Sequence, residues 1–172
     1  MKKGKSYCLT ENINLIVYDF DGVLTDNKVI LREDGLESVV VNRSDGLATT
    51  IIKNTGIAQV IITAETNKVV EVRAKKIGIP VIKNVQNKKE TLLKYCREKN
   101  VPLKNVVYIG NDLNDLEAMK CVGYPVCPSD AYPEVKKVAK IILPVPGGQG
   151  VVRGFLRYLK EGNGNQGTAG KV

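Results

Sequence analysis

Short apolar runs alternate along the chain with segments that look helical. The first run, residues 13–18 (INLIVY), is continuous and rich in β-branched residues. A strand that is apolar on both faces is typical of a parallel sheet that is covered on both sides. The runs predict strands at residues 13–18, 58–62, 81–82, 105–109, 122–126 and 140–143.

The segments between these runs predict helices at residues 45–54, 67–77, 88–99, 113–120 and 149–159. Ser44 or Asp45 can cap the first helix, and Gly78 suits the end of the second. Pro102 keeps the third helix from extending further. The alternation of strands and helices with short loops predicts an α/β fold, a doubly wound parallel sheet of the Rossmann-like kind.

Two segments depart from this alternation. Residues 28–31 and 38–41 flank a turn-like stretch that contains Asp34-Gly35, which predicts an inserted β-hairpin. Residues 162–172 are rich in glycine, and we expect a flexible tail there after one domain over residues 1–161. The tail contains the spacing Gly-x-Gly-x-x-Gly, but no strand precedes it and no helix can follow it, which argues against a dinucleotide site.

Composition narrows the possible chemistry. The chain has 172 residues, of which 43% are hydrophobic, and a formal net charge of +8. It contains no histidine, which excludes His-based triads, His metal ligands and His general bases. Few aromatic residues and no reader motif argue against nucleic acid as a partner. No apolar run is long enough for a membrane span, so we expect no membrane partner.

The cysteines and the start of the chain bear on its location. The four cysteines form no Cys-x-x-Cys pair; they are Cys8, Cys96, Cys121 and Cys127. The basic residues at the start are not followed at once by an apolar stretch, as they are in a secretory signal. We therefore expect reduced thiols in a cytoplasmic protein.

Polar side chains follow three of the predicted strands. In a doubly wound sheet, the binding crevice lies beyond the carboxyl ends of the strands, so these side chains are candidates for a common site. They are Asp19 and Asp21, then Thr63 and Glu65, then Asn111 and Asp112.

The pair Asp19 and Asp21 suits phosphoryl transfer. Two carboxylates spaced i, i+2 at a strand end can reach one reaction centre if the chain turns there. One can act as a nucleophile that forms an acyl phosphate, and the other, held as the acid, can protonate a leaving oxygen. Crowded carboxylates call for a cation, and hard oxygen ligands suit Mg²⁺, which would also neutralise phosphate charge.

Four motifs together resemble those of the haloacid dehalogenase (HAD) superfamily of phosphatases. The first, D-x-D-G-x-[LV]-[TS] after an apolar strand, begins at Asp19, and the second, a Thr that ends an apolar strand, is Thr63. The third, a Lys that opens a helix, is matched by Lys88, with Lys89 as the less favoured choice. The fourth is the acidic cluster GNDLND at residues 110–115.

The resemblance implies a role for each matched residue. The implied set is Asp19 as nucleophile and Mg²⁺ ligand, Asp21 as general acid/base with its backbone carbonyl on the metal, Thr63 and Lys88 as ligands of the phosphoryl group, and Asp112 as the third metal ligand. Asn111 and Asp115 are implied as supporting residues, and we expect Asp115 to orient Lys88.

The absence of a large insertion narrows the resemblance further. Only a hairpin separates the first motif from the next helix, so no cap domain is expected. This pattern, with DFDGVLTDN at 19–27 and PGGQGVVR at 146–153, resembles the 3-deoxy-D-manno-octulosonate (KDO) 8-phosphate phosphatase group. Members are typically homotetramers, which implies a homotetramer with a lid from a neighbouring subunit.

Ala64-Glu65 departs from the Gly-Arg that the octulosonate enzymes commonly have after the second motif. An acidic residue there resembles the branch that acts on 2-keto-3-deoxynonulosonate (KDN) or N-acetylneuraminate 9-phosphate, and we favour that branch over KDO 8-phosphate. Glu65 could accept hydrogen bonds from sugar hydroxyls, or it could simply cap a helix. The full expected set of substrate-binding residues is Gly22, Ala64, Glu65, Arg73 and Lys76, with the two basic residues on the sugar carboxylate, either within one chain or across a subunit interface.

Two other classes of function remain open. The chain could be a non-catalytic oligomerisation domain like those at the C-terminus of CMP-sialate synthetases, or a phospho-accepting receiver domain. Intact Asp19, Asp21, Lys88 and Asp112 favour a phosphatase over the first class, and the hairpin argues against the second. Residues 68–104 carry 11 basic and 3 acidic side chains, which suits an anionic substrate but equally suits solvated helix faces.

Overall fold

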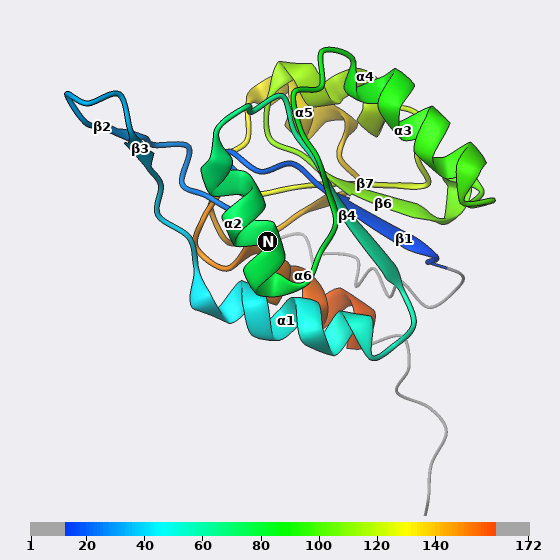
Figure 1. Cartoon of the computed structure of the whole chain (residues 1–172). Helices are drawn as coiled ribbons and strands as arrows, with labels where there is room; N and C mark the ends of the chain where they lie inside the picture. Colours follow the sequence, from blue (N-terminus) through cyan, green and yellow to red (C-terminus); the bar gives the residue numbers. More distant parts are fainter. Residues whose placement is uncertain (1–12, 161–172) are drawn as a thin grey trace, which may run out of the picture.

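Six parallel strands form the central sheet of the computed structural model, which describes residues 13–160 (Figure 1). In order across the sheet they are β5 (Val81–Ile82), β4 (Ala58–Ile62), β1 (Leu15–Tyr18), β6 (Val106–Ile109), β7 (Tyr124–Cys127) and β8 (Ile141–Ile142). The first strand of the chain therefore lies in the middle, paired with β4 on one side and with β6 on the other. The predicted doubly wound parallel sheet is confirmed.

Helices cover both faces of this sheet (Figure 1). One face packs against α1 (Arg43–Lys53), α2 (Lys68–Ile77) and α6 (Val151–Lys160). The other packs against α3 (Lys88–Glu98), α4 (Leu116–Met119) and α5 (Pro133–Val138). Two short 3₁₀ turns, η1 (Leu103–Asn105) and η2 (Leu113–Asp115), flank β6.

The fully buried strand β1 supplies both hydrophobic cores. Ile16 and Tyr18 belong to the core under α1 and α6, whereas Leu15 and Val17 belong to the core under α3 and α4. Successive side chains of a strand point to opposite faces of the sheet, so a continuous apolar run is what a doubly covered strand requires.

The predicted hairpin is present and projects from the body of the molecule (Figure 1). Its strands, β2 (Ile30–Leu31) and β3 (Glu37–Ser38), are antiparallel and shorter than predicted. Gly35 occupies the turn with φ +79°. In the described part of the chain, only this hairpin lies between β1 and α1, in agreement with the expectation of no cap domain.

Helix ends differ from prediction in ways that have physical causes. The cap of α1 is Asn42, whose side chain accepts a hydrogen bond from the Ser44 N–H, so neither Ser44 nor Asp45 is the cap. The segment predicted as one helix at 113–120 divides into η2 and α4, because Asp112 and Asp115 form a capping box around η2. The six-residue helix α5, with Pro133 at its start, was not predicted.

Some predictions concern the ends of the chain or its environment. Cys8, the domain boundary at 161 and the glycine-rich tail lie outside the described residues. Among residues 13–160, Cys96, Cys121 and Cys127 are free thiols. No described helix is long and apolar enough to cross a bilayer.

Asp45 joins the first and last helices. Its side chain is fully buried, and Oδ1 accepts a hydrogen bond from the Arg153 N–H of α6 at 3.0 Å. Its other carboxylate oxygen, Oδ2, has no hydrogen-bond partner among the described residues. Burial raises the pKa of Asp45 to about 6, although the Arg153 N–H and the nearby Arg73 favour the charged form.

We predict that Asp45 makes stability depend on pH. Because its pKa rises from 3.8 to about 6 on folding, the folded state binds this proton more tightly, and the contribution of Asp45 to the free energy of unfolding falls as pH rises from about 4 to 6. The full difference corresponds to about 3 kcal/mol. Asp45→Asn, which keeps an acceptor for Arg153, should remove that dependence in urea unfolding at pH 4 and 7. The exposed hairpin residue Glu33 gives the control, Glu33→Gln, and an equal slope in both variants would contradict the prediction.

Candidate active site

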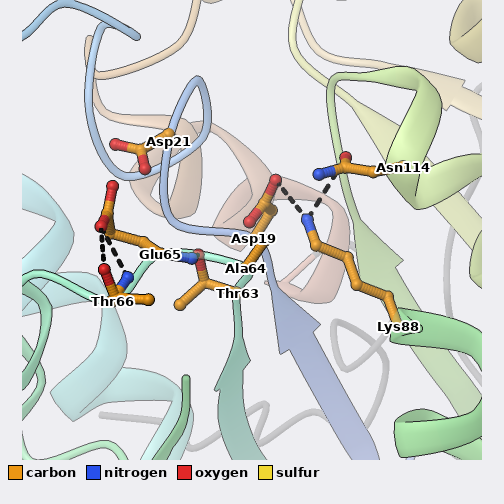
Figure 2. A pocket seen from close by; sticks show the side chains of 8 residues that line it. All are labelled: Asp19, Asp21, Thr63, Ala64, Glu65, Thr66, Lys88 and Asn114. Carbon is orange, nitrogen blue, oxygen red and sulfur yellow. Dashed lines mark hydrogen bonds and ion pairs between the residues drawn. The ribbon is translucent and has the colours of Figure 1, made fainter. Parts of the chain in front are cut away.

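The carboxyl ends of β1, β4 and β6 lie side by side, because Tyr18 is in register with Ile61 on one side and with Ile109 on the other. The residues that follow these strands therefore meet at one edge of the sheet. They border an open cavity of about 260 Å³ (Figure 2). Its lining residues are Asp19, Asp21, Thr63, Ala64, Glu65, Thr66, Lys88 and Asn114.

A tight turn after β1 brings two carboxylates to this cavity. The backbone N–H groups of Leu24 and Thr25 both donate to the Phe20 carbonyl, at 2.8 and 3.1 Å, which coils the chain directly after Asp19. Asp19 is 5% exposed, and its Oδ1 accepts the Phe20 N–H at 2.7 Å. Oδ1 of the less buried Asp21 accepts the Thr25 hydroxyl at 3.1 Å.

Neighbouring segments pack closely against this turn. Gly22 has φ +75°, and a Cβ there would lie 2.0 Å from Asn111 Nδ2, so the turn needs glycine for both conformation and space. From the other side, a Cβ at Gly147 would lie 2.3 Å from the Gly22 carbonyl oxygen. The Gly148 N–H donates to the Val23 carbonyl at 3.1 Å. The segment before α6 thus supports the turn from behind.

Lys88 connects the turn to the opposite side of the cavity. Its Nζ lies 2.7 Å from Asp19 Oδ2 and 2.8 Å from Asp115 Oδ1, and the residue is 3% exposed. Asn87 caps α3 through the Glu90 N–H, which starts the helix directly at Lys88. Lys89 instead faces the surface, 3.8 Å from Glu117. The structure therefore brings Lys88, and not Lys89, to Asp19.

Asp115 is the fully buried acceptor that holds Lys88 in place. Its Oδ1 also accepts the Tyr108 hydroxyl at 2.9 Å, while Oδ2 accepts the N–H groups of Asn111 and Asp112 at 3.0 and 3.3 Å. Its carboxylate thus fixes both the lysine and the backbone that follows β6.

The electrostatics of this cluster favour a further cation. Burial, followed by the charge of Asp115, raises the pKa of Asp19, even though Lys88 acts in the opposite direction. Burial alone would lower the pKa of Lys88, but Asp19 and Asp115 raise it, so the ammonium stays charged. Two buried carboxylates share one ammonium, and a cation beside Asp19 would balance the excess negative charge.

Two adjacent residues after β6 are candidates to hold a hard metal ion together with Asp19, and neither lines the cavity. The predicted ligand Asp112 accepts the Leu113 N–H through Oδ1 and caps η2. Asn111 is 6% exposed and packs against Gly22, and its Oδ1 has no hydrogen-bond partner within residues 13–160. The same part of the chain contains no cluster of three or more His, Cys, Asp or Glu suited to a metal. The donors that the structure shows at the turn after β1 include the Asp19 carboxylate and this amide oxygen.

The predicted basic substrate ligands lie elsewhere in this chain. Arg73 is 9% exposed, and its Nη2 donates to the Asn42 carbonyl at 2.7 Å, because the face of α2 that carries it packs toward α1. Lys76 is exposed on α2, and neither residue lines the cavity. Gly22 does not line the cavity either, since the Asn111 side chain packs directly against it.

The segment after β4 does reach the cavity. Thr63 is 2% exposed and accepts the Glu65 N–H through its hydroxyl at 3.1 Å, and the exposed Ala64 follows it on the cavity wall. Glu65 Oε1 accepts the N–H groups of Thr66 and Asn67 at 2.6 and 2.8 Å. Glu65 therefore braces the start of α2 and also borders the cavity (Figure 2).

Three nearby residues were missed from the sequence, and one of them, Thr66, lines the cavity directly after Glu65. Asn114 lies 3.4 Å from Lys88 Nζ, and its position within the GNDLND cluster was a usable signal. Glu37 comes from the hairpin, where nothing in the local pattern indicated a role. Burial raises the pKa of Asp21, and the charges of Glu65 and Glu37 add to that effect against the Thr25 hydrogen bond.

Comparisons with known proteins identify the family of the chain. Residues 49–155 match the profile of the haloacid dehalogenase-like hydrolases. The 3-deoxy-D-manno-octulosonate 8-phosphate phosphatase KdsC of Escherichia coli (strain K12) is 34% identical over 144 residues, which cover 83% of this chain and 77% of that protein.

Solved structures show the same similarity. The phosphatase of that name from Moraxella catarrhalis, in complex with magnesium ion, phosphate ion and a KDO molecule, has a TM-score of 0.87 and 30% identity, with 92% of each chain covered. A protein assigned to the HAD hydrolases from Streptomyces avermitilis has a TM-score of 0.86 and 37% identity, with 90% of this chain and 88% of that chain covered. The names of the relatives agree with the predicted phosphomonoesterase class. They specify an octulosonate, so the expected preference for the nine-carbon branch is not confirmed.

Proposed function

Because the chain belongs to the haloacid dehalogenase-like hydrolase family, we propose that it is a Mg²⁺-dependent phosphatase of a 2-keto-3-deoxy sugar-acid phosphate, with KDO 8-phosphate as its first candidate substrate. The observation that carries the proposal is the buried Asp19 carboxylate at the strand ends, held 2.7 Å from Lys88 Nζ on the wall of an open cavity. A non-catalytic oligomerisation domain would not need this arrangement.

The geometry suits a two-step hydrolysis. In the first step, an oxygen of Asp19 forms a bond to phosphorus, the bond from phosphorus to the sugar oxygen breaks, and Asp21 donates a proton to that oxygen. In the second step, water attacks the aspartyl phosphate, gives a proton to Asp21 and releases inorganic phosphate and free Asp19. Lys88 and the hydroxyl of Thr63 donate to the phosphoryl oxygens, where charge spreads during transfer.

In this proposal Asp19, the backbone carbonyl of Asp21 and Asn111 hold the Mg²⁺. Bound there, the ion neutralises charge on the phosphoryl group. Asn111 replaces the Asp112 expected from the sequence, because its buried Oδ1 is without a partner in the described structure while the Asp112 carboxylate caps η2. An amide oxygen is an accepted ligand for hard cations.

We predict that metal binding depends on Asn111 and not on Asp112. Asn111→Ala should weaken Mg²⁺ binding at least about tenfold in isothermal titration calorimetry, since even outer ligands contribute that much. The matched variant Asp112→Ala should bind within about twofold of the unchanged protein, because it removes only a cap. Thermal unfolding without Mg²⁺ checks that both variants fold. If only Asp112→Ala lost Mg²⁺ binding, Asp112 and not Asn111 would be the metal ligand.

The nine-carbon substrates remain the second candidates for one reason. Glu65 borders the cavity where the octulosonate enzymes commonly have arginine, and its carboxylate is suited to sugar hydroxyls. The relatives named for KDO 8-phosphate support the eight-carbon substrate more strongly.

The buried thiols of Cys96 and Cys127 suit a reducing compartment, and we propose that the enzyme acts in the cytoplasm.

The function is tested by phosphate release from three sugar-acid phosphates. With Mg²⁺, we expect turnover of KDO 8-phosphate to exceed that of KDN 9-phosphate and N-acetylneuraminate 9-phosphate, and chelation should abolish all of it. Asp19→Asn should fold and bind substrate but turn over at least about 10³-fold more slowly, because the amide is not a nucleophile. If phosphate is released from none of the three esters, the proposal is refuted. If a nine-carbon ester is hydrolysed faster than KDO 8-phosphate, that ester is the preferred substrate.

The hairpin is the basis for a proposal about assembly. Its large apolar side chains are about half exposed or more; they are Val29, Ile30, Leu31, Leu36 and Val40. A two-stranded hairpin with such side chains in water is marginally stable by itself, and such a patch is typical of an interface. We propose that hairpins of further copies cover it in a homotetramer, which would place a neighbour as a lid over each cavity.

Light scattering tests this assembly. We expect a mass near four times the 18.8 kDa of one chain. Leu31→Glu, at the most exposed of these positions, should reduce the mass to that of smaller species by burying a charge, while Glu33→Gln on the same hairpin should not. A monomer mass for the unchanged protein would exclude the shared lid.

A further inference from the structure

Glu37 is held beside the segment that borders the catalytic cavity, although it belongs to none of the motifs that build the site. It lies on β3 of the hairpin, is partly buried, and its Oε2 accepts a hydrogen bond from Asn67 Nδ2 at 3.0 Å. Asn67 caps α2, with its own Oδ1 accepting the Val69 N–H at 3.1 Å. That bond fixes which end of the amide faces Glu37, so the hairpin carboxylate is anchored to the rigid end of a helix.

The same Asn67 holds a second carboxylate in position. Its backbone N–H donates to Glu65 Oε1 at 2.8 Å, and Glu65 lines the cavity (Figure 2). Within residues 13–160, Glu65 Oε2 and Glu37 Oε1 make no hydrogen bond, so each carboxylate retains a free acceptor.

The size of the cavity decides what Glu37 can meet. A volume of about 260 Å³ is smaller than the roughly 300–1,000 Å³ of most small-molecule pockets. It accommodates a phosphoryl group and the carbons next to it, so the rest of a sugar acid must extend past the mouth. Glu37 does not line the cavity, but Asn67 holds it beside Glu65, which does, so the part of a substrate that extends past Glu65 can meet Glu37.

A second carboxylate held next to Glu65, beside a site for an anion, calls for a chemical explanation. A carboxylate accepts hydrogen bonds well from hydroxyl groups, but it repels a second anion. In KDO 8-phosphate the carboxylate and the phosphate lie at opposite ends of the chain, with hydroxyl-bearing carbons next to the phosphate. A substrate of that kind satisfies Glu37, whereas a short ester with its carboxylate close to the phosphate does not.

We propose that Glu37 is a specificity-determining residue that admits phosphomonoesters with hydroxyl groups next to the phosphate and rejects those with an anionic group there. The inference rests on the proposed phosphatase function. In this proposal the hairpin of each chain contributes to substrate specificity, in addition to any role in assembly.

A matched pair of small esters tests the proposal. Glycerol 3-phosphate and 3-phosphoglycerate share three carbons and differ in whether the far carbon is a hydroxymethyl group or a carboxylate. We expect the unchanged enzyme to prefer glycerol 3-phosphate by kcat/KM. Glu37→Gln, which can still accept from Asn67, should lower that preference by about tenfold, mainly through KM, because it loses a charged acceptor and a repulsive charge.

Glu33→Gln is the matched control, since Glu33 is an exposed glutamate on the same hairpin, and its preference should equal that of the unchanged enzyme. An unaltered ratio of the two kcat/KM values in an active Glu37→Gln variant would overturn the inference. This includes the case in which kcat/KM falls equally for both esters, as expected if Glu37 only holds the hairpin in place. If the unchanged enzyme releases phosphate from neither ester nor from any of the sugar-acid phosphates, the proposed function fails, and this inference fails with it.

Discussion

One ammonium group shared by two buried carboxylates is the constraint on which the site depends. Lys88 Nζ contacts Asp19 and Asp115 at 2.7 and 2.8 Å, and all three side chains are almost fully buried. Removal of Lys88 would leave two carboxylates without a cation in a poorly solvated place, which costs several kcal/mol, whereas removal of either carboxylate would take away one of the two charged acceptors that position the ammonium. The three residues come from the turn after β1, the start of α3 and η2, so this interaction also holds together elements that are far apart in the sequence.

Much of the architecture could be predicted because local chemistry and tertiary environment agree. The continuous apolar run after residue 13 has a single good position, in the middle of a doubly covered sheet, and β4 and β5 have the predicted bounds. The short helix α5 could not be predicted, since six residues show little periodicity. The cap at Asn42 was missed because Ser44 and Asp45 are equally good capping residues by type.

The sequence predicted which loops come together at the site, but it predicted less well which atoms of those loops contact one another. Asn111 and Asp112 are adjacent and both polar, and their order in the chain does not reveal which side chain packs on Gly22 and which caps η2. Arg73 looks available on a helix surface, yet the face of α2 that carries it packs toward α1. Such outcomes depend on long-range packing, which spacing along the chain does not encode.

The close fit between Gly147 and the Gly22 carbonyl has a consequence for synthesis of the protein. The turn after β1 is translated early, but its support comes from the segment that precedes the final described helix, and β1 also waits for β4 and β6. A ribosome must therefore release nearly the whole polypeptide before the nucleophile reaches its final position. A chain that terminates upstream of that segment keeps the local hydrogen bonds to Phe20 but lacks the contacts of Gly147 and Gly148 that support the turn.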